Sequence, residues 1–287
     1  MPGQTNIKTF IAILVNPRSG KGKAVVLGKK ITDILSQREV RHQIFTDPWP
    51  SLLDDFSEAW IVGGDGTINY FINCYKDISI PLALFGGGTG NDLAWKLYGD
   101  VSLVEQVERV LSAEARPVDA ASCNGKLYLN SLGIGFDGEV LQSMGAIRWL
   151  GGHLGYLWVV IRKIFSFREI EFTYHIGGEV TKQRSLLVII NNSTRTGGGF
   201  MVSPLASLND GLLDLVLCSP LSVINRLRYL PVIEKGKHLK LPFIQYRQCD
   251  RLRVECQFAT YAAMDGELIE EKIFDISVLP GKYKFKF

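Results

Sequence analysis

Apolar residues in the first 120 positions follow two alternating patterns. Continuous apolar runs at Thr9–Val15, which is rich in β-branched residues, and at Ala59–Val62 and Pro81–Phe85 predict buried strands of a parallel sheet. A shorter run, His42–Phe45, predicts one more strand. Between the runs, apolar residues recur at helical spacing, most clearly over residues 68–75. Strands and helices that alternate in this way predict a doubly wound, Rossmann-like α/β domain.

After Asp119 the pattern changes to short strand-like runs separated by turns, with helical patterns at His153–Phe165 and Val223–Leu230. The runs are Lys126–Asn130, Ile170–Ile176, Ser185–Ile190, Leu212–Leu217, Arg251–Glu255, Ile273–Leu279 and Tyr283–Phe287. Consecutive strands of this kind predict an antiparallel β-sandwich. A length of 287 residues also favours two domains. We predict one domain at residues 1–120 and a second at residues 121–287. The last strand of the chain either belongs to the second domain or returns to the first domain.

Glycine is the one compositional outlier, with 29 of 287 residues, where about 7% is usual. The glycines cluster at positions 20–22, 63–66, 86–90 and 197–199. Such clusters are typical of backbone that approaches a ligand or adopts positive φ. Three of the four clusters follow predicted strands of the first domain. In open α/β sheets, ligands bind at the carboxyl ends of the strands, so these clusters predict a binding edge.

The motif GGDGT, Gly63–Thr67, joins a predicted strand to a predicted helix. Glycine backbone N–H groups and a helix N-terminus favour phosphate. A carboxylate in such a loop repels phosphate unless a cation lies between them, so Asp65 predicts Mg²⁺ together with phosphate. A tight structural turn is the alternative, which explains the glycines but not the aspartate.

Two further loops follow predicted strands of the same domain. Asn16–Lys23 (NPRSGKGK) lacks the Walker A spacing, although Ser19, the backbone amides and Lys21 are suited to phosphate. Gly86–Asp92 is a glycine loop with polar members at Thr89 and Asp92. A third helix is expected to start there, with Asn91 or Asp92 as its N-cap. A solvated or structural turn remains the alternative for each loop.

The second domain contains two Asp-Gly pairs, at Asp210–Gly211 and Asp265–Gly266, the latter followed by Glu267. Asp-Gly is a turn by default, and between strands it favours a hairpin. A carboxylate beside such a turn could also act as a general base for a hydroxyl.

These motifs occur in a fixed order: NPRSGKGK, GGDGTIN, GGGTGNDLA, NSLGIGFDGEV, GGGF-x-x-x-P-x-A-x-x-x-DG-x-LD and MDGE. In this order they resemble the diacylglycerol kinase catalytic-domain superfamily, in particular its bacterial soluble lipid kinases. The resemblance runs from about Thr9 to the C-terminus. GGDGT alone is less specific, since phosphofructokinases and NAD kinases share it.

The resemblance implies an ATP-dependent, Mg²⁺-dependent lipid kinase with its active site in a cleft between the two domains. Asp65 and Asp92 match the acids of the family's Asp–water–Mg²⁺ network, and Glu267 matches its catalytic base. Tyr70 stands where many relatives carry an acid, which weakens transfer of a substrate-side role to that helix. The positions matched to nucleotide binding, with Lys21 added from the loop itself, are Asn16, Pro17, Arg18, Ser19, Gly20, Lys21, Thr46, Gly63, Gly64, Asp65, Gly66, Thr67, Ile68, Asn69 and Thr89. A structural Mg²⁺ matches Ser207, Asp210 and Leu212, the outer two through backbone carbonyls.

The net charge of +3 is unevenly distributed along the chain. Residues 225–253 contain eight Lys or Arg against two acids, which favours an anionic partner such as a membrane surface, or else a solvated face with ion pairs. The apolar segment 149–167, rich in aromatics and flanked by Arg and Lys, predicts a lipid pocket, a membrane contact or a core helix. No nucleic-acid-binding module is recognisable, so we predict no nucleic-acid partner.

Two other functions stay open: a kinase of a soluble substrate, similar to NAD kinases, and a catalytically silent lipid-binding protein. Asp65, Asp92 and Glu267 occur together, which argues against the silent protein. Five scattered cysteines and a start without a signal-peptide pattern predict a cytoplasmic protein, with peripheral contact to the inner membrane surface. The sequence leaves a homodimer open and does not identify the lipid.

Overall fold

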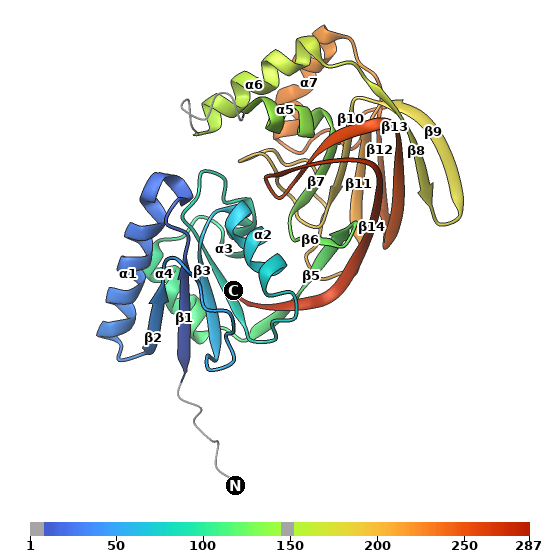
Figure 1. The fold of residues 1–287 in the computed structure, drawn as a ribbon. Coiled ribbons are helices and arrows are strands. Elements are labelled where there is room, and N and C mark those ends of the chain that lie inside the picture. The colour runs from blue at the N-terminus through green and yellow to red at the C-terminus, as the bar shows by residue number, and fades with distance from the viewer. Residues whose placement is uncertain (1–8, 145–151) are drawn as a thin grey trace. The chain divides into compact units, whose positions relative to one another are not determined.

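The computed structural model describes residues 9–144 and 152–287 (Figure 1). The chain divides into two compact units. Unit 1 ends at Pro117 and also contains Tyr283–Phe287, while unit 2 is Val118–Lys282. The predicted boundary lay near residue 120, and the final residues of the chain belong to unit 1.

Unit 1 is built on a parallel sheet in the order β2-β1-β3-β4, and the end of β14 adds beside β4. α1 packs against α4, and α2 packs against α3. The elements are β1 Phe10–Val15, η1 Ser19–Gly22, α1 Lys23–Gln37, β2 Arg41–Phe45, β3 Glu58–Gly63, α2 Asp65–Cys74, β4 Leu82–Gly86, α3 Asp92–Tyr98 and α4 Leu103–Ser112. The predicted Rossmann-like α/β arrangement of the first half is therefore confirmed.

The parallel strands of unit 1 form its core, as continuous apolar runs require. Residues 11–15 of β1 and 59–62 of β3 are completely buried. Helix α1 approaches β1 closely at Gly28, where an added Cβ would lie 2.7 Å from Val15 Cγ2. This helix therefore needs glycine at its contact with the sheet.

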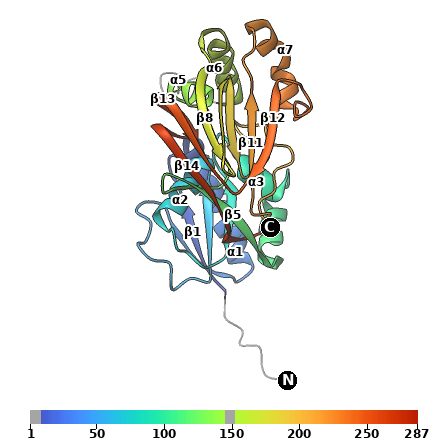
Figure 2. The same ribbon diagram turned by 90° about the vertical axis from the view of Figure 1, so that its right-hand side faces the viewer.

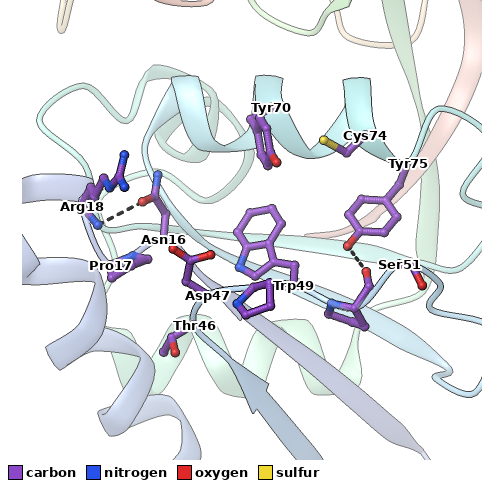
Figure 3. Close-up of a pocket in the computed structure, with 12 residues that line it drawn as sticks. Asn16, Pro17, Arg18, Thr46, Asp47, Trp49, Ser51, Tyr70, Cys74 and Tyr75 are labelled. Atoms are coloured by element: carbon purple, nitrogen blue, oxygen red, sulfur yellow. Dashed lines mark hydrogen bonds between the residues drawn. The ribbon is translucent and has the colours of Figure 1, made fainter.

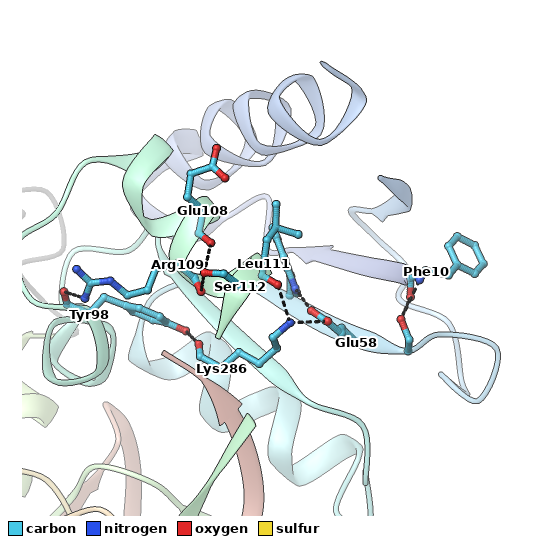
Figure 4. A network of polar contacts seen from close by, with 10 residues as sticks. Phe10, Glu58, Tyr98, Glu108, Arg109, Leu111, Ser112 and Lys286 are labelled. Carbon is cyan, nitrogen blue, oxygen red and sulfur yellow. Dashed lines mark hydrogen bonds and ion pairs between the residues drawn. The ribbon is translucent and has the colours of Figure 1, made fainter. Parts of the chain in front are cut away.

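A buried polar network fixes the end of β14 within unit 1 (Figure 4). The Lys286 ammonium lies 2.8 Å from Glu58 Oε1, and both residues are less than a tenth exposed. Trp60 Nε1 donates to Glu58 Oε2 at 2.9 Å, and the Tyr98 hydroxyl donates to the Lys286 carbonyl at 3.0 Å. Tyr98 also accepts the N–H of Leu84 on β4. Because both charges are buried, removal of either side chain would leave the other as an uncompensated buried charge.

Unit 2 is an antiparallel β-sandwich with helices. One set of neighbouring strands runs β12-β11-β10-β7-β13-β14, while β8 and β9 pair beside the first half of β13. The elements are β5 Ala115–Cys123, β6 Lys126–Tyr128, β7 Ser131–Gly135, α5 Phe136–Met144, α6 Gly152–Ser166, β8 Ile170–Ile176, β9 Glu179–Ser185, β10 Leu187–Asn191, β11 Leu213–Cys218, α7 Val223–Glu234, β12 Ile244–Cys249, β13 Arg251–Met264 and β14 Glu267–Lys286. β5 begins and β14 ends in unit 1. The predicted sandwich is confirmed.

Strand β13 contributes to both layers of the sandwich because its pairing changes along its length. Arg253–Cys256 pairs with β8, whereas Ala262–Met264 pairs with β7. Between Glu255 and Thr260 the register with β14 shifts, as at a β-bulge, which lets a strand bend away from one sheet. One apolar cluster fills the sandwich, and a second lies between the sheet and α5, α6 and α7.

Several elements of the structure escaped prediction from the sequence pattern. α4, α5, β5, β7, β9 and β12 are all absent from the predicted set. β9 (EVTKQRS) is mostly exposed and lacks an apolar face, and β7 (SLGIG) contains two glycines, so neither carries the expected strand signal. The two predicted C-terminal strands are one continuous strand, β14. Among the described residues, no helix has the length and apolarity needed to cross a bilayer.

Lys286→Met should lower the free energy of unfolding by about 3 kcal/mol, because it leaves the buried Glu58 carboxylate without its counter-ion. Glu58→Gln combined with Lys286→Met should recover more than half of that loss, since Gln can still accept from Trp60. Urea denaturation of the three proteins measures both values. Equal stability of Lys286→Met and wild type would contradict this account of the network.

Candidate functional site

Three glycine loops meet at the carboxyl edge of the unit 1 sheet. An added Cβ on Gly88 would lie 2.4 Å from Gly64 Cα, and one on Gly20 would lie 2.3 Å from the Gly87 carbonyl oxygen. Gly20 also has a φ of +58°. Real side chains never approach backbone so closely, so these positions require glycine. The loops after β1, β3 and β4 are therefore in direct backbone contact.

Side chains of the first loop hold the second in place. Asn16 Nδ2 donates to Thr67 Oγ1 at 2.9 Å, and the Gly64 N–H donates to Ser19 Oγ at 3.1 Å. The structure thus brings the predicted residues of NPRSGKGK and GGDGT together on one edge of unit 1. Lys21 and Thr89 are exposed on these loops. Ile68 is buried and its N–H donates to the Gly64 carbonyl, so its contribution to the edge is structural.

The Asp65 carboxylate caps helix α3. Its Oδ2 accepts the N–H of Asp92, and its Oδ1 accepts the N–H of Leu93, each at 3.1 Å. The sequence predicts Asn91 or Asp92 as the N-cap. Asn91 does occupy that position, but its side chain makes no cap hydrogen bond and instead accepts the Gly88 N–H at 2.9 Å. Asp65 therefore links the GGDGT loop to the third glycine loop.

The donor set around Asp65 suits a hard cation. A carboxylate offers only oxygen acceptors, which is the donor type that Mg²⁺ prefers. The carboxylate of Asp92 belongs to the same helix start and is 2% exposed. The described residues contain no group of three or more His, Cys, Asp or Glu side chains placed to hold a metal. A Mg²⁺ ion at this edge would thus complete its shell with water and phosphate oxygens, as Mg²⁺ commonly does.

A pocket of about 610 Å³ lies beside the first loop (Figure 3). Its lining includes the predicted residues Asn16, Pro17, Arg18 and Thr46. The volume falls within the usual range for small-molecule sites. The phosphate-type loops of unit 1 therefore adjoin a cavity large enough for an organic ligand.

Aromatic side chains that the sequence analysis did not assign to a site make up much of this pocket. The Trp49 ring centroid lies 5.7 Å from that of Tyr70, and Trp49 Nε1 donates to the Val15 carbonyl at 3.2 Å. The Tyr75 hydroxyl donates to the Pro50 carbonyl. Trp49 and Tyr75 are thus held in place, while Tyr70 is 61% exposed. In the sequence, the only signals for these pocket residues are a tryptophan between two prolines and an aromatic residue at an outward-facing helical position.

In unit 2, the DGE segment forms a tight hairpin between β13 and β14. Asp265 and Gly266 have φ of +48° and +85°, and Met264 pairs with Glu267. Positive φ at both central residues is typical of a type I′ turn, which favours Asp-Gly. The hairpin predicted at this point is therefore present.

The two carboxylates of this hairpin have different surroundings. Asp265 is 3% exposed and accepts the N–H groups of Leu129, Asn130 and Ser131 at 2.7, 3.0 and 2.8 Å. Glu267 is exposed at the start of β14. Backbone amides occupy the Asp265 carboxylate, so Glu267 is the one suited to accept a proton from a substrate hydroxyl.

The predicted structural Mg²⁺ loop is tied to a buried aspartate that the sequence analysis did not single out. Asp119 accepts the N–H groups of Gly211 and Gly281 at 2.8 and 2.7 Å. Asp210 Oδ1 accepts the Leu212 N–H at 3.1 Å, and Asp210 is exposed. One carboxylate with backbone carbonyls of Ser207 and Leu212 is an all-oxygen set, which fits Mg²⁺. Asp119 lies in no motif, so only its contacts reveal it.

Comparison with known proteins agrees with this architecture. The family model for the diacylglycerol kinase catalytic domain matches residues 11–123, and that for the YegS C-terminal NAD kinase beta sandwich-like domain matches residues 130–285. A diacylglycerol kinase of Mycobacterium tuberculosis (strain CDC 1551 / Oshkosh) is 25% identical, covering 94% of this chain and 93% of the relative. A diacylglycerol kinase of Bacillus subtilis (strain 168) is 26% identical, covering 75% and 72%.

Solved structures share the fold. A putative diacylglycerol kinase from Bacillus anthracis str. Sterne superposes with a TM-score of 0.82 at 22% identity, covering 100% of this chain and 97% of that one. Yeast NADH kinase superposes with a TM-score of 0.54 at 13% identity, covering 96% and 79%. At these identities the likeness concerns the fold alone. With family models matched over both halves, the chain belongs to the diacylglycerol kinase catalytic-domain family with a YegS-type C-terminal β-sandwich.

Proposed function

We propose that this protein is an ATP-dependent lipid kinase that transfers the γ-phosphoryl group of ATP to a hydroxyl of diacylglycerol or a related lipid. The observation that carries the proposal is the junction of three glycine loops around Asp65, beside the pocket of Trp49 and Tyr70. Family membership supports a lipid kinase at the level of the family. ATP is supplied in the cytoplasm, and the lipid lies at the membrane surface.

In the proposed reaction, backbone N–H groups of the glycine loops bind the phosphates, since such loops at helix N-termini favour anions. The base and ribose enter the pocket lined by Asn16, Thr46, Trp49 and Tyr70. Phosphoryl transfer depends chiefly on positioning and on electrostatic stabilisation, so rigid loops are the main requirement. The steric contacts between Gly64 and Gly88 supply this rigidity.

Glu267 accepts the proton of the lipid hydroxyl in this proposal. The hydroxyl oxygen then forms a bond to the γ-phosphorus while the bond to the β–γ bridging oxygen breaks, and ADP leaves. Asp265 holds the hairpin rigid through its three amide hydrogen bonds. Mg²⁺ near Asp65 and Asp92 would neutralise the charge that develops on the phosphoryl oxygens. A second Mg²⁺ at Ser207, Asp210 and Leu212 would have a structural role.

Asp65→Asn should lower kcat on the order of 100-fold, because it removes the negative charge that attracts Mg²⁺. Stability should fall by about 1 kcal/mol, since one N–H of α3 loses its acceptor. Transfer of ³²P from ATP to a panel of lipids, and to NAD⁺ as the soluble alternative, measures the activity. Wild-type turnover in Asp65→Asn would confine Asp65 to its capping role. Transfer to NAD⁺ alone would replace the lipid-kinase proposal.

Glu267→Gln should lower kcat by about 100-fold or more with unchanged thermal stability, because Glu267 is exposed and acts on the proton. Glu270→Gln on the same strand is the matched control and should behave as wild type. Asp265→Asn should instead lower the melting temperature, since an amide cannot accept three N–H groups as a carboxylate does. The same transfer assay with thermal denaturation separates these cases. Full activity of Glu267→Gln would remove its role as the base.

Trp49→Ala should raise KM for ATP by up to about tenfold with a smaller change in kcat, because stacking of the base on an aromatic ring contributes about 0.5–1.5 kcal/mol. Trp49→Phe keeps a ring and should retain most of the affinity. Tyr75→Phe tests whether the pocket wall needs the bond to Pro50. Titration with a fluorescent ATP analogue checks binding independently of turnover. Unchanged KM in Trp49→Ala would place the base elsewhere.

A further inference from the structure

Helix α6 has two apolar faces. Val159, Val160 and Ile164 are buried in the cluster beneath the helices of unit 2. On the other side, Trp158 and Phe165 are exposed, and Phe165 is 62% exposed. An amphipathic helix on a core normally presents polar residues to solvent. The apolar outer face of α6 therefore lacks an explanation within the fold.

Ile161 continues this outer face, one turn from each of its neighbours at 158 and 165. Arg162 lies next to it, and its guanidinium is 5.8 Å from the Trp158 ring centroid. Aromatic, aliphatic and cationic side chains thus share one side of the helix. This composition is typical of helices that lie in the interface of a lipid bilayer.

Helix α7 packs against α6 (Figures 1 and 2). Its exposed residues repeat the apolar pattern. Ile224 is 78% exposed and Leu227 is exposed one turn later. Arg226 turns inward instead, where it donates to the carbonyls of Ile164 and Phe167 and pairs with Glu169. The inward arginine joins the two helices and leaves the apolar residues of α7 outside.

The charges around these helices are almost all positive. The exposed cations on and next to the two helices are Arg162, Arg168, Arg228, Lys235, Lys237 and Lys240. Residues 152–168 include no acid, and residues 223–240 include only Glu234. By contrast, Arg226, Arg247 and Arg253 form ion pairs with Glu169, Glu179 and Glu255. The basic patch predicted from the sequence therefore divides into residues with acidic partners and an excess of exposed cations on and just beyond the two helices.

We propose that this surface, consisting of Trp158, Ile161, Phe165, Ile224 and Leu227 with their surrounding cations, docks the protein on an anionic phospholipid bilayer. Apolar side chains would enter the headgroup region, and the cations would pair with anionic lipids. The charge complementarity selects the bilayer as the partner. The inference rests on the proposed function only in that a lipid kinase must reach its substrate at a membrane.

Co-sedimentation of the full chain with vesicles tests the surface. Binding is expected to phosphatidylcholine vesicles containing phosphatidylglycerol and to weaken strongly without the anionic lipid. Phe165→Ser combined with Ile224→Ser should lower the partition coefficient at least tenfold. Arg162→Gln combined with Arg228→Gln should lower it by roughly 25-fold at low salt, since each basic side chain contributes about a fivefold factor at an anionic surface.

Matched controls change exposed residues of the same unit elsewhere. Phe258→Ser with Val180→Ser, and Lys126→Gln with Lys272→Gln, should bind vesicles as wild type does. The surface proposal is overturned if wild type does not bind anionic vesicles, or if the control pairs lose as much binding as the test pairs. It is also overturned if the test variants bind normally but convert a dimer to a monomer, which would make the surface a contact between copies.

A second readout separates this proposal from the proposed function. On lipid dispersed in detergent micelles, Phe165→Ser with Ile224→Ser should phosphorylate at the wild-type rate, while its rate on vesicles falls. Vesicle binding by a protein that phosphorylates no lipid would support the surface and refute the kinase proposal. If the wild type phosphorylates lipid and the test variants bind vesicles as well as the wild type does, the kinase proposal is supported and the surface proposal is refuted.

Discussion

In both units, hydrogen bonds from backbone N–H groups to a buried or half-buried aspartate hold the loops of the candidate sites in place. Asp65 accepts two such bonds, Asp119 two and Asp265 three. Hydrogen bonds to a charged acceptor are stronger than neutral ones, and each contributes about 1.5–3 kcal/mol. In every case the bonded segments are distant in sequence. These carboxylates therefore fix loops that neither helix nor strand ladders constrain.

The backbone hydrogen bonds that a carboxylate accepts limit its capacity to accept a proton from a substrate or to bind an ion. A carboxylate is an acceptor only, with about four lone-pair sites. Three amide hydrogen bonds leave Asp265 little capacity to accept a proton. Glu267, two residues later, is exposed and is therefore better placed to accept one. Asp65 is half-buried and accepts the N–H groups of Asp92 and Leu93, so it lies between a backbone-held acid such as Asp265 and an exposed one such as Glu267. Residue type and spacing alone do not distinguish these three situations.

The sequence was sufficient to predict the alternating α/β half, the β-rich half and the glycine loops, because buried parallel strands and glycine clusters leave strong local patterns. It was insufficient for Asp119, for Trp49 and for strand β9, whose roles arise from tertiary contacts. The capping of α3 shows the reason clearly. Asn91 has the right type and position for an N-cap, yet a carboxylate 26 positions earlier in the chain caps the helix instead, and Asn91 closes the glycine loop.

The glycine clusters have two different physical causes, although they look alike in the sequence. At Gly64 and Gly88 a side chain would collide with backbone, so glycine is needed for close approach between loops. At Gly197 and Gly198 the φ values are +63° and +76°, and a Cβ on Gly198 would meet nothing within 4 Å. There glycine serves the conformation of a turn. A substitution at Gly198 would thus strain one turn, while one at Gly64 would separate the loops on which the proposed phosphate site depends.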